Sequence, residues 1–161
     1  MATQIRPNIH CSDAEWQARL ELAACYRIFD LMGWSESVYN HISLRVPDEE
    51  GAFLINPFGL LYSEVTASNL VKIDIDGNKL DDNPHPVNLA GFTQHGYFHR
   101  HLDWAHAICH VHTTATMAVR AAADLPATKA WTSSEATGTA ATLVSAPLPP
   151  PVVQNYRRTS Y

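Results

Sequence analysis

The sequence has few cysteines, no long hydrophobic run and no excess of positive charge. Its 161 residues include only Cys11, Cys25 and Cys109, and a small odd number is typical of reduced thiols rather than of a disulfide framework. No apolar run approaches the ~20 residues of a membrane helix, and the first ten residues lack the apolar core of a signal peptide. The sequence therefore predicts a cytoplasmic protein with no membrane span.

The charge balance excludes further classes. There are 11 Lys and Arg against 16 Asp and Glu, for a net charge of −5, and the basic residues form no stripe. This argues against nucleic acid and against an anionic membrane as partners. The hydrophobic fraction of 46% is that of a globular domain. Histidine is abundant: there are nine, six of them between His95 and His112.

The N-terminal part predicts a helix from about Ser12 to Met32. Ser12 and Glu15 have the spacing of a capping box, and Gly33 is a natural stop. Apolar residues recur between them at helical spacing and predict one buried face, made of Trp16, Leu20, Ala24, Ile28 and Met32.

Further elements alternate along the chain. Strands are predicted from alternating or β-branched apolar residues, and helices from longer periodic segments. The strands are 41–46, 52–55, 71–75 and 107–112, and the helices are 89–101 and 113–122. This order predicts an α/β domain in which helices cover a sheet.

The composition changes after Pro126. The segment 127–161 is rich in Thr, Ala, Ser and Pro, includes the run PLPPP, and shows no clear periodicity. We therefore expect one domain over 1–126 and a poorly ordered tail over 127–161.

His110 and His112 are the strongest candidate metal ligands. Residues i and i+2 of a strand point to the same face, about 6.5–7 Å apart, so the two imidazoles could converge on one cation. A catalytic zinc usually has three protein ligands and one open position, so a further donor would be needed. Taken alone, the pattern fits two hydrogen-bonded, partly buried histidines better than a metal site, and the four histidines just upstream add weight to the metal interpretation.

His95 and His99 have the spacing of the HExxH zinc motif, but Gly96 stands where that motif has its general-base glutamate. This excludes a metalloprotease and favours a helix face that carries polar rings beside the sheet. Cys109 and His110 cannot form a catalytic dyad, because adjacent strand residues face opposite sides. No GxSxG, GxGxxG or Walker motif is present.

Three stretches together carry a family resemblance. They are GWSESVYNHISLRVP, FLINPFGLLYSEVTASNLVKIDIDGN and LAGFTQHGYFHRHLDWAHAICHVHTTATMAV. Over about residues 14–125 the chain resembles the class II aldolase/adducin family. The resemblance implies a three-layer α/β/α domain, here C-terminally truncated, that commonly assembles as a tetramer. The family includes zinc-dependent aldolases and epimerases of sugar phosphates, the non-enzymatic adducin head domains, and uncharacterised adducin-like bacterial proteins.

The family's pair of metal-binding histidines matches His110 and His112, which implies zinc or another divalent cation as cofactor. In the aldolases a third histidine ligand lies well downstream, whereas this sequence has no histidine after His112. The glycine of the family's second phosphate loop matches Gly59, which on its own reads as an ordinary turn.

At other positions, the residues that the aldolases use are replaced in this sequence. The aldolase general base, a glutamate, corresponds to Gly91, and the two serines before it that help bind the substrate phosphate correspond to Leu89 and Ala90. The Gly-Asn of the first phosphate loop corresponds to Asn40 and His41. In these positions the chain is more similar to the adducin-like branch than to the aldolases.

Three functions remain open at this level. The first is a metal-dependent lyase on a small hydroxy-carbonyl or sugar compound, in which His95, Tyr97 or His99 replaces the missing glutamate as acid or base. The second is a non-enzymatic adducin-like module that forms homo-oligomers or binds an actin-type partner. The third is an inactive fragment. Members of the family are longer than this sequence, and the change of composition after Pro126 suggests a truncated or frame-shifted product of a longer gene. A natural short variant whose tail folds on a partner is the alternative to truncation.

Overall fold

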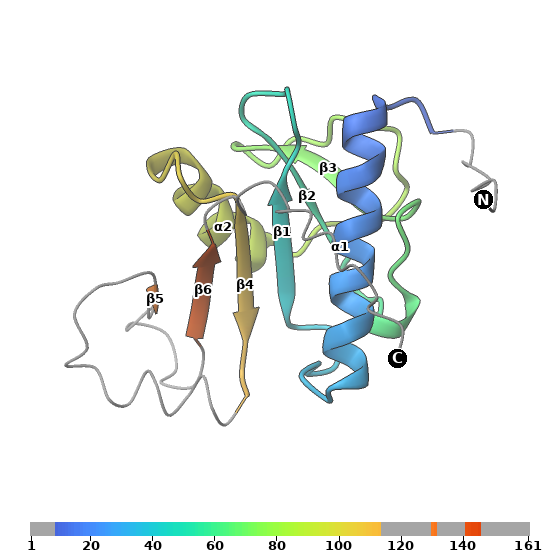
Figure 1. Cartoon of the computed structure of the whole chain (residues 1–161), viewed down its shortest axis with the longest axis vertical. Helices are drawn as coiled ribbons and strands as arrows, with labels where there is room; N and C mark the ends of the chain where they lie inside the picture. Colours follow the sequence, from blue (N-terminus) through green and yellow to red (C-terminus); the bar gives the residue numbers. More distant parts are fainter. Residues whose placement is uncertain (1–8, 114–129, 132–140, 146–161) are drawn as a thin grey trace, which may run out of the picture.

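The computed structural model describes residues 9–113, 130–131 and 141–145, and Figure 1 shows their arrangement. The described strands are antiparallel and form one sheet of order β3-β2-β1-β4-β6-β5. The elements are α1 (Asp13–Leu31), β1 (His41–Arg45), β2 (Ala52–Ile55), a 3-10 helix η1 (Tyr62–Glu64), β3 (Val71–Asp74), α2 (Leu89–His101), β4 (Ala107–Val111), β5 (Ala130–Trp131) and β6 (Ala141–Ser145).

The start and end of α1 follow from the sequence, but its buried face does not. Ser12 Oγ accepts a hydrogen bond from the Glu15 amide at 3.0 Å, and Gly33 follows the helix with φ of +67°. The expected buried face was wrong: Ile28 and Met32 are each 53% exposed. The buried residues are instead Glu15, Ala18, Arg19, Leu22 and Tyr26, because a buried ion pair and a tyrosine take the core side of the helix.

The two helices cover opposite faces of the sheet, which confirms the three-layer α/β/α fold (Figure 1). In β1, Ile42 packs in the core cluster under α1. The alternate residues His41 and Ser43 contact His95 of α2. Because successive strand residues point to opposite faces, β1 belongs to both layers, and its α2 side carries the polar residues.

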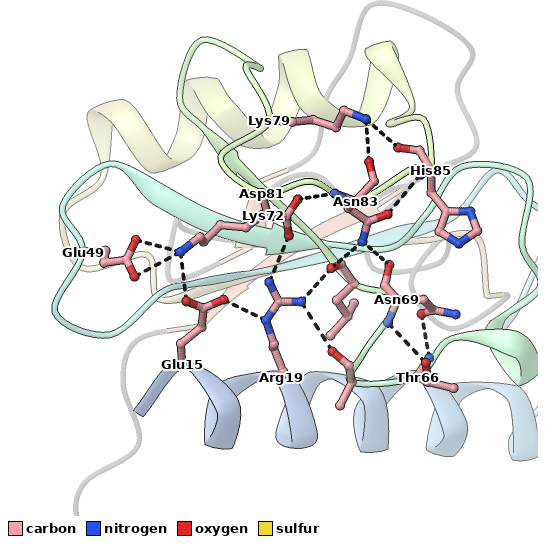
Figure 2. Close-up of polar contacts among 12 residues, drawn as sticks. Glu15, Arg19, Glu49, Thr66, Asn69, Lys72, Lys79, Asp81, Asn83 and His85 are labelled. Carbon is pink, nitrogen blue, oxygen red and sulfur yellow. Dashed lines mark hydrogen bonds and ion pairs between the residues drawn. The ribbon is translucent and has the colours of Figure 1, made fainter. Parts of the chain in front are cut away.

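A network of charges fixes α1 to the edge of the sheet (Figure 2). Arg19 Nε lies 2.8 Å from Glu15 Oε1, and its Nη2 lies 3.1 Å from Asp81 Oδ2 in the loop after β3. Arg19 Nη1 also donates to the Leu70 carbonyl oxygen at 2.7 Å. Lys72 of β3 reaches Glu15 Oε2 at 2.9 Å. Burying these charges is tolerated only because each of them is paired.

The strand β6 was not expected from the sequence. It pairs with β4, placing Val144 opposite Ile108 and Leu143 opposite Cys109. The expected helix over 113–122 and most of 127–161 lie outside the described residues, so the domain boundary at 126 stays a prediction. Within the described ranges, neither helix is long and apolar enough to cross a bilayer.

Candidate functional site

Strand register and α2 together assemble five histidines on one side of the sheet. β1 pairs with β4 so that His41 lies directly opposite His110, and His112 follows two residues later. The helix α2 places His95 and His99 over the same face. We refer to these five residues as the histidine cluster.

His110 and His112 face each other through their Nε2 atoms, which are 3.0 Å apart. Two imidazole nitrogens bound to one tetrahedral metal at ~2.0–2.1 Å would be about 3.3 Å apart, so the observed separation is close to that of a ligand pair. Burial, and then the charges of His41 and His112, lower the pKa of His110 to about 3. The ring is therefore neutral at physiological pH, as a metal ligand must be.

Glu36 contacts His112 at the ring nitrogen that does not face His110. Its Oε2 lies 2.6 Å from His112 Nδ1, so Nδ1–H donates to the carboxylate, and His112 Nε2 accepts the hydrogen bond that His110 Nε2–H donates. A carboxylate behind a histidine in this way is the usual outer partner of a metal-bound imidazole. Glu36 precedes β1 by five residues and nothing in the local sequence marked it as part of a site.

His41 completes a row of imidazoles across the two strands. Its ring stacks on that of His110, with ring centres 4.7 Å apart and planes inclined by 20°. Its Nδ1 lies 3.2 Å from the Tyr39 carbonyl oxygen, so Nδ1–H is the donor and Nε2 carries the lone pair. That Nε2 is buried and has no hydrogen-bond partner. Burial, as the largest cause, lowers the pKa of His41 to about 4.

Ser43 links the two histidines of α2. Its Oγ lies 2.6 Å from His95 Nδ1 and 2.9 Å from His99 Nε2. All three side chains are buried. Burial lowers the pKa of His99 to about 3 and that of His95 well below its ordinary value. The predicted acid–base residues His95 and His99 are thus brought together on the inside of the domain.

Tyr97, the third predicted acid–base residue, is not part of this arrangement. It is 59% exposed, and its ring lies 4.5 Å from that of His101 on the outer side of α2. The helix period separates it from His95 and His99, which occupy the inner side.

Gly91 has no room for a side chain. A Cβ atom built on it would lie 2.7 Å from Cδ2 and 3.0 Å from Nε2 of His41. Contacts below 3.0 Å require one of the groups to move. The imidazole of His41 therefore fills the space into which any residue at position 91 would point, and a glutamate there would collide with it.

In the part of the chain that the structure describes, His110 and His112 have no third ligand beside them in the observed side-chain positions. Across residues 9–113, 130–131 and 141–145, no three His, Cys, Asp or Glu side chains are arranged to hold one metal ion. A hollow of about 590 Å³ lies elsewhere, at the charged network around Arg19 and Lys72. Four of its charged residues, Glu15, Arg19, Lys72 and Asp81, are already paired with one another, so the histidine cluster is the better candidate site.

Comparison with known proteins identifies the family of the chain. The family model for the class II aldolase and adducin N-terminal domain matches residues 20–157. A putative aldolase class 2 protein of Caulobacter vibrioides is 48% identical over 110 residues, which are 68% of this chain and 43% of that protein. Alpha-adducin of Rattus norvegicus is 51% identical over 105 residues, 64% of this chain and 14% of that protein. The chain thus spans less than half the length of these relatives.

Two solved structures share the fold. An aldolase II superfamily protein from Pseudomonas syringae superposes with a TM-score of 0.65 at 45% identity, covering 68% of this chain and 44% of that one. The L-fuculose 1-phosphate aldolase from Glaciozyma antarctica PI12 gives a TM-score of 0.63 at 29% identity, with 77% and 51% covered. These matches agree with the α/β fold seen around the histidine cluster.

Proposed function

Since the chain belongs to the class II aldolase and adducin N-terminal domain family, we propose that it is a divalent-metal-dependent lyase of aldolase type. Its substrate would be a small hydroxy-carbonyl or sugar compound. The observation that carries this proposal is the pair of Nε2 atoms of His110 and His112, 3.0 Å apart, with Glu36 behind His112.

His110 and His112 would hold the metal, and zinc is a divalent cation that imidazole ligands commonly bind. A cation at this position supplies Lewis-acid polarisation of a carbonyl or hydroxyl oxygen, which makes the neighbouring carbon easier to deprotonate. Glu36 keeps His112 in the tautomer that leaves Nε2 unprotonated. Burial keeps His110 neutral, and a cation bound by this pair would take the place of the proton that His110 Nε2 donates to His112 Nε2.

Proton transfer needs a second group, and position 91 cannot supply it. Among the predicted residues, the geometry favours His95, because its ring centre lies 4.4 Å from that of His41, which stacks on His110. His99 would act through Ser43 to hold His95 in place. Tyr97 lies on the outer side of α2, so a role for it requires a substrate that extends around the helix.

The substrate we propose carries no phosphate. Leu89 and Ala90 stand in the places of the serines that help bind phosphate in the aldolases, and neither offers a hydroxyl group. One structural relative is an L-fuculose 1-phosphate aldolase, which makes L-fuculose 1-phosphate a useful comparison substrate. A homo-oligomer and a cytoplasmic location remain predictions that accompany this proposal.

A deuterium-exchange assay tests the proposal. The zinc-loaded chain should exchange protons beside the carbonyl of dihydroxyacetone or an unphosphorylated ketose in D₂O, followed by proton NMR. EDTA, or the double substitution His110→Asn/His112→Asn, should lower the exchange rate by about 100-fold or more, since a metal contributes several kcal/mol to such a step. The variant His101→Asn, at an exposed histidine outside the cluster, is the control. Exchange that persists with EDTA and in the double variant would contradict the proposal.

The second candidate function is a non-enzymatic, adducin-like binding module. The observation that favours it is Gly91, whose side-chain space is filled by His41, so that no carboxylate base fits there. The 51% identity to alpha-adducin points the same way. Stoichiometric metal without any proton exchange would favour this module, and co-sedimentation with filamentous actin would then test an actin-type partner.

A further inference from the structure

We propose that His41 supplies the third imidazole ligand of the metal held by His110 and His112. The proposal rests on the function proposed above and names a ligand that comes from β1 instead of from the chain beyond β4. The complete set would be three histidines on two neighbouring strands, with the fourth position open. Three imidazoles and one open position are an established ligand set for catalytic zinc.

The backbone register is the first argument. His41 and His110 are directly opposed in the antiparallel pair of β1 and β4, so their Cβ atoms lie about 4.5–5.5 Å apart on the same face. His112 is two residues further along and turns its Nε2 to that of His110. The three imidazoles are therefore attached at neighbouring backbone positions, and rotation of side chains alone could bring their nitrogen atoms to one point.

The state of the His41 ring is the second argument. Its Nε2 is buried without a hydrogen-bond partner, which is costly for a polar atom unless something binds there. Its Nδ1 donates to the Tyr39 carbonyl, so the lone pair is on Nε2, the atom that must face a metal. A histidine with Nδ1 bound to a carbonyl oxygen and Nε2 open has the usual form of a metal-binding imidazole.

The space at Gly91 is the third argument. A Cβ at this position would lie within 3.0 Å of three atoms of the His41 ring, so glycine is what gives the imidazole its place beside His110. As the rings stand, His41 is stacked on His110 and must turn about its Cβ–Cγ bond to point Nε2 at the pair. This turn would lengthen the contact between His41 Nδ1 and the Tyr39 carbonyl oxygen, which is already long, at 3.2 Å.

His95 is the other histidine whose buried Nε2 has no partner, but its position is less suitable. Its ring is in contact with His41, and its Nδ1 is fixed by Ser43. His41 is the ring that stacks on His110. His95 is thus one ring further from His110 than His41 is, and it is the less suitable third ligand.

Zinc and cobalt affinities of the whole chain test the inference. We expect His41→Asn to weaken zinc binding by more than 100-fold, because loss of an outer partner alone already costs about 10- to 100-fold. His101→Asn is the matched control and should bind as the unaltered chain does. Circular dichroism confirms that each variant is folded.

Three outcomes separate the two proposals. If His41→Asn binds zinc like the unaltered chain while His110→Asn/His112→Asn does not bind, the inference about His41 is wrong and the proposed metal pair stands. If the folded, unaltered chain binds no zinc, both are wrong. Should the variants fail to fold, X-ray absorption of the zinc-loaded unaltered chain decides, with three imidazoles per zinc expected and two overturning the inference.

Discussion

Lowering the pH from about 7 to about 5 is expected to unfold the metal-free chain. The cause is the histidine cluster, because burial holds the pKa of His41 at about 4 and those of His99 and His110 at about 3, while that of His95 is also well below the ordinary value of 6.5. The folded chain keeps these rings neutral, whereas the unfolded chain protonates them as soon as the pH falls below about 6.5.

Protonation thus favours the unfolded state, and stability is lost as the pH falls from about 6.5 toward the folded values of about 3 to 4. Each such histidine lowers the free energy of unfolding by about 1.4 kcal/mol per pH unit over this range. Four together would cost about 5 kcal/mol per pH unit, which is comparable with the whole stability of a small domain. The carboxylate Glu15, whose pKa is lowered, adds to the loss only below its ordinary value of 4.5.

Urea unfolding at a series of pH values measures this effect. The slope of the unfolding free energy against pH gives the number of protons taken up, and we expect between three and four near pH 5.5, as an estimate from these pKa shifts. His99→Gln should lower that number by about one, because this ring is neutral in the folded chain and protonated in the unfolded one. A free energy of unfolding that is constant between about pH 7 and pH 5 would contradict the account of the cluster as buried and neutral.

Replacing Arg19 by methionine is expected to destabilise the fold strongly. The guanidinium is 1% exposed and pairs with Glu15 and Asp81, so its loss leaves a buried carboxylate with only Lys72 as partner. It also removes the donor to the Leu70 carbonyl. Breaking a buried pair from one side typically costs about 3–5 kcal/mol.

Thermal unfolding checks this expectation, and a fall of more than about 10 °C in the melting temperature is predicted. Arg100→Met is the matched control, because Arg100 pairs with Asp76 in solvent, with exposed fractions of 46% and 68% for the two side chains. An exposed pair is worth at most about 1 kcal/mol. Equal effects of the two substitutions would show that the network around Arg19 does not hold α1 to the sheet.

Local pattern was sufficient to predict most of the elements. The helix α2 has the bounds that the sequence indicated, β2 does as well, and β1 and β3 differ by one residue at one end. Periodicity and turn residues are local properties, and they carry this information. They did not identify the buried face of α1, because the charges of Glu15 and Arg19 are buried through partners 50 or more residues away, such as Lys72 and Asp81.

The arrangement of the histidine cluster depends on which strands pair and in what register, and local sequence pattern does not contain this information. The HxH spacing was enough to select His110 and His112, whereas the opposition of His41 and His110 follows from the register of two strands about 70 residues apart. Glu36 lies in the loop before β1 and reaches His112, and Ser43 contacts His95 because alternate residues of β1 face α2. Neither residue belongs to a sequence motif that could have identified it. The strand β6 was missed because its short ATLVS segment lies in Thr- and Ala-rich sequence.

The metal content of the purified chain tests the central claim most directly. The chain would be produced without a histidine tag, and divalent metals per chain would be measured by elemental analysis beside the variant His110→Asn/His112→Asn. The account predicts a near-stoichiometric divalent metal that is lost in the variant, with both proteins folded by circular dichroism. A folded, unaltered chain that neither retains nor takes up zinc would contradict it, and His110 and His112 would then be structural histidines.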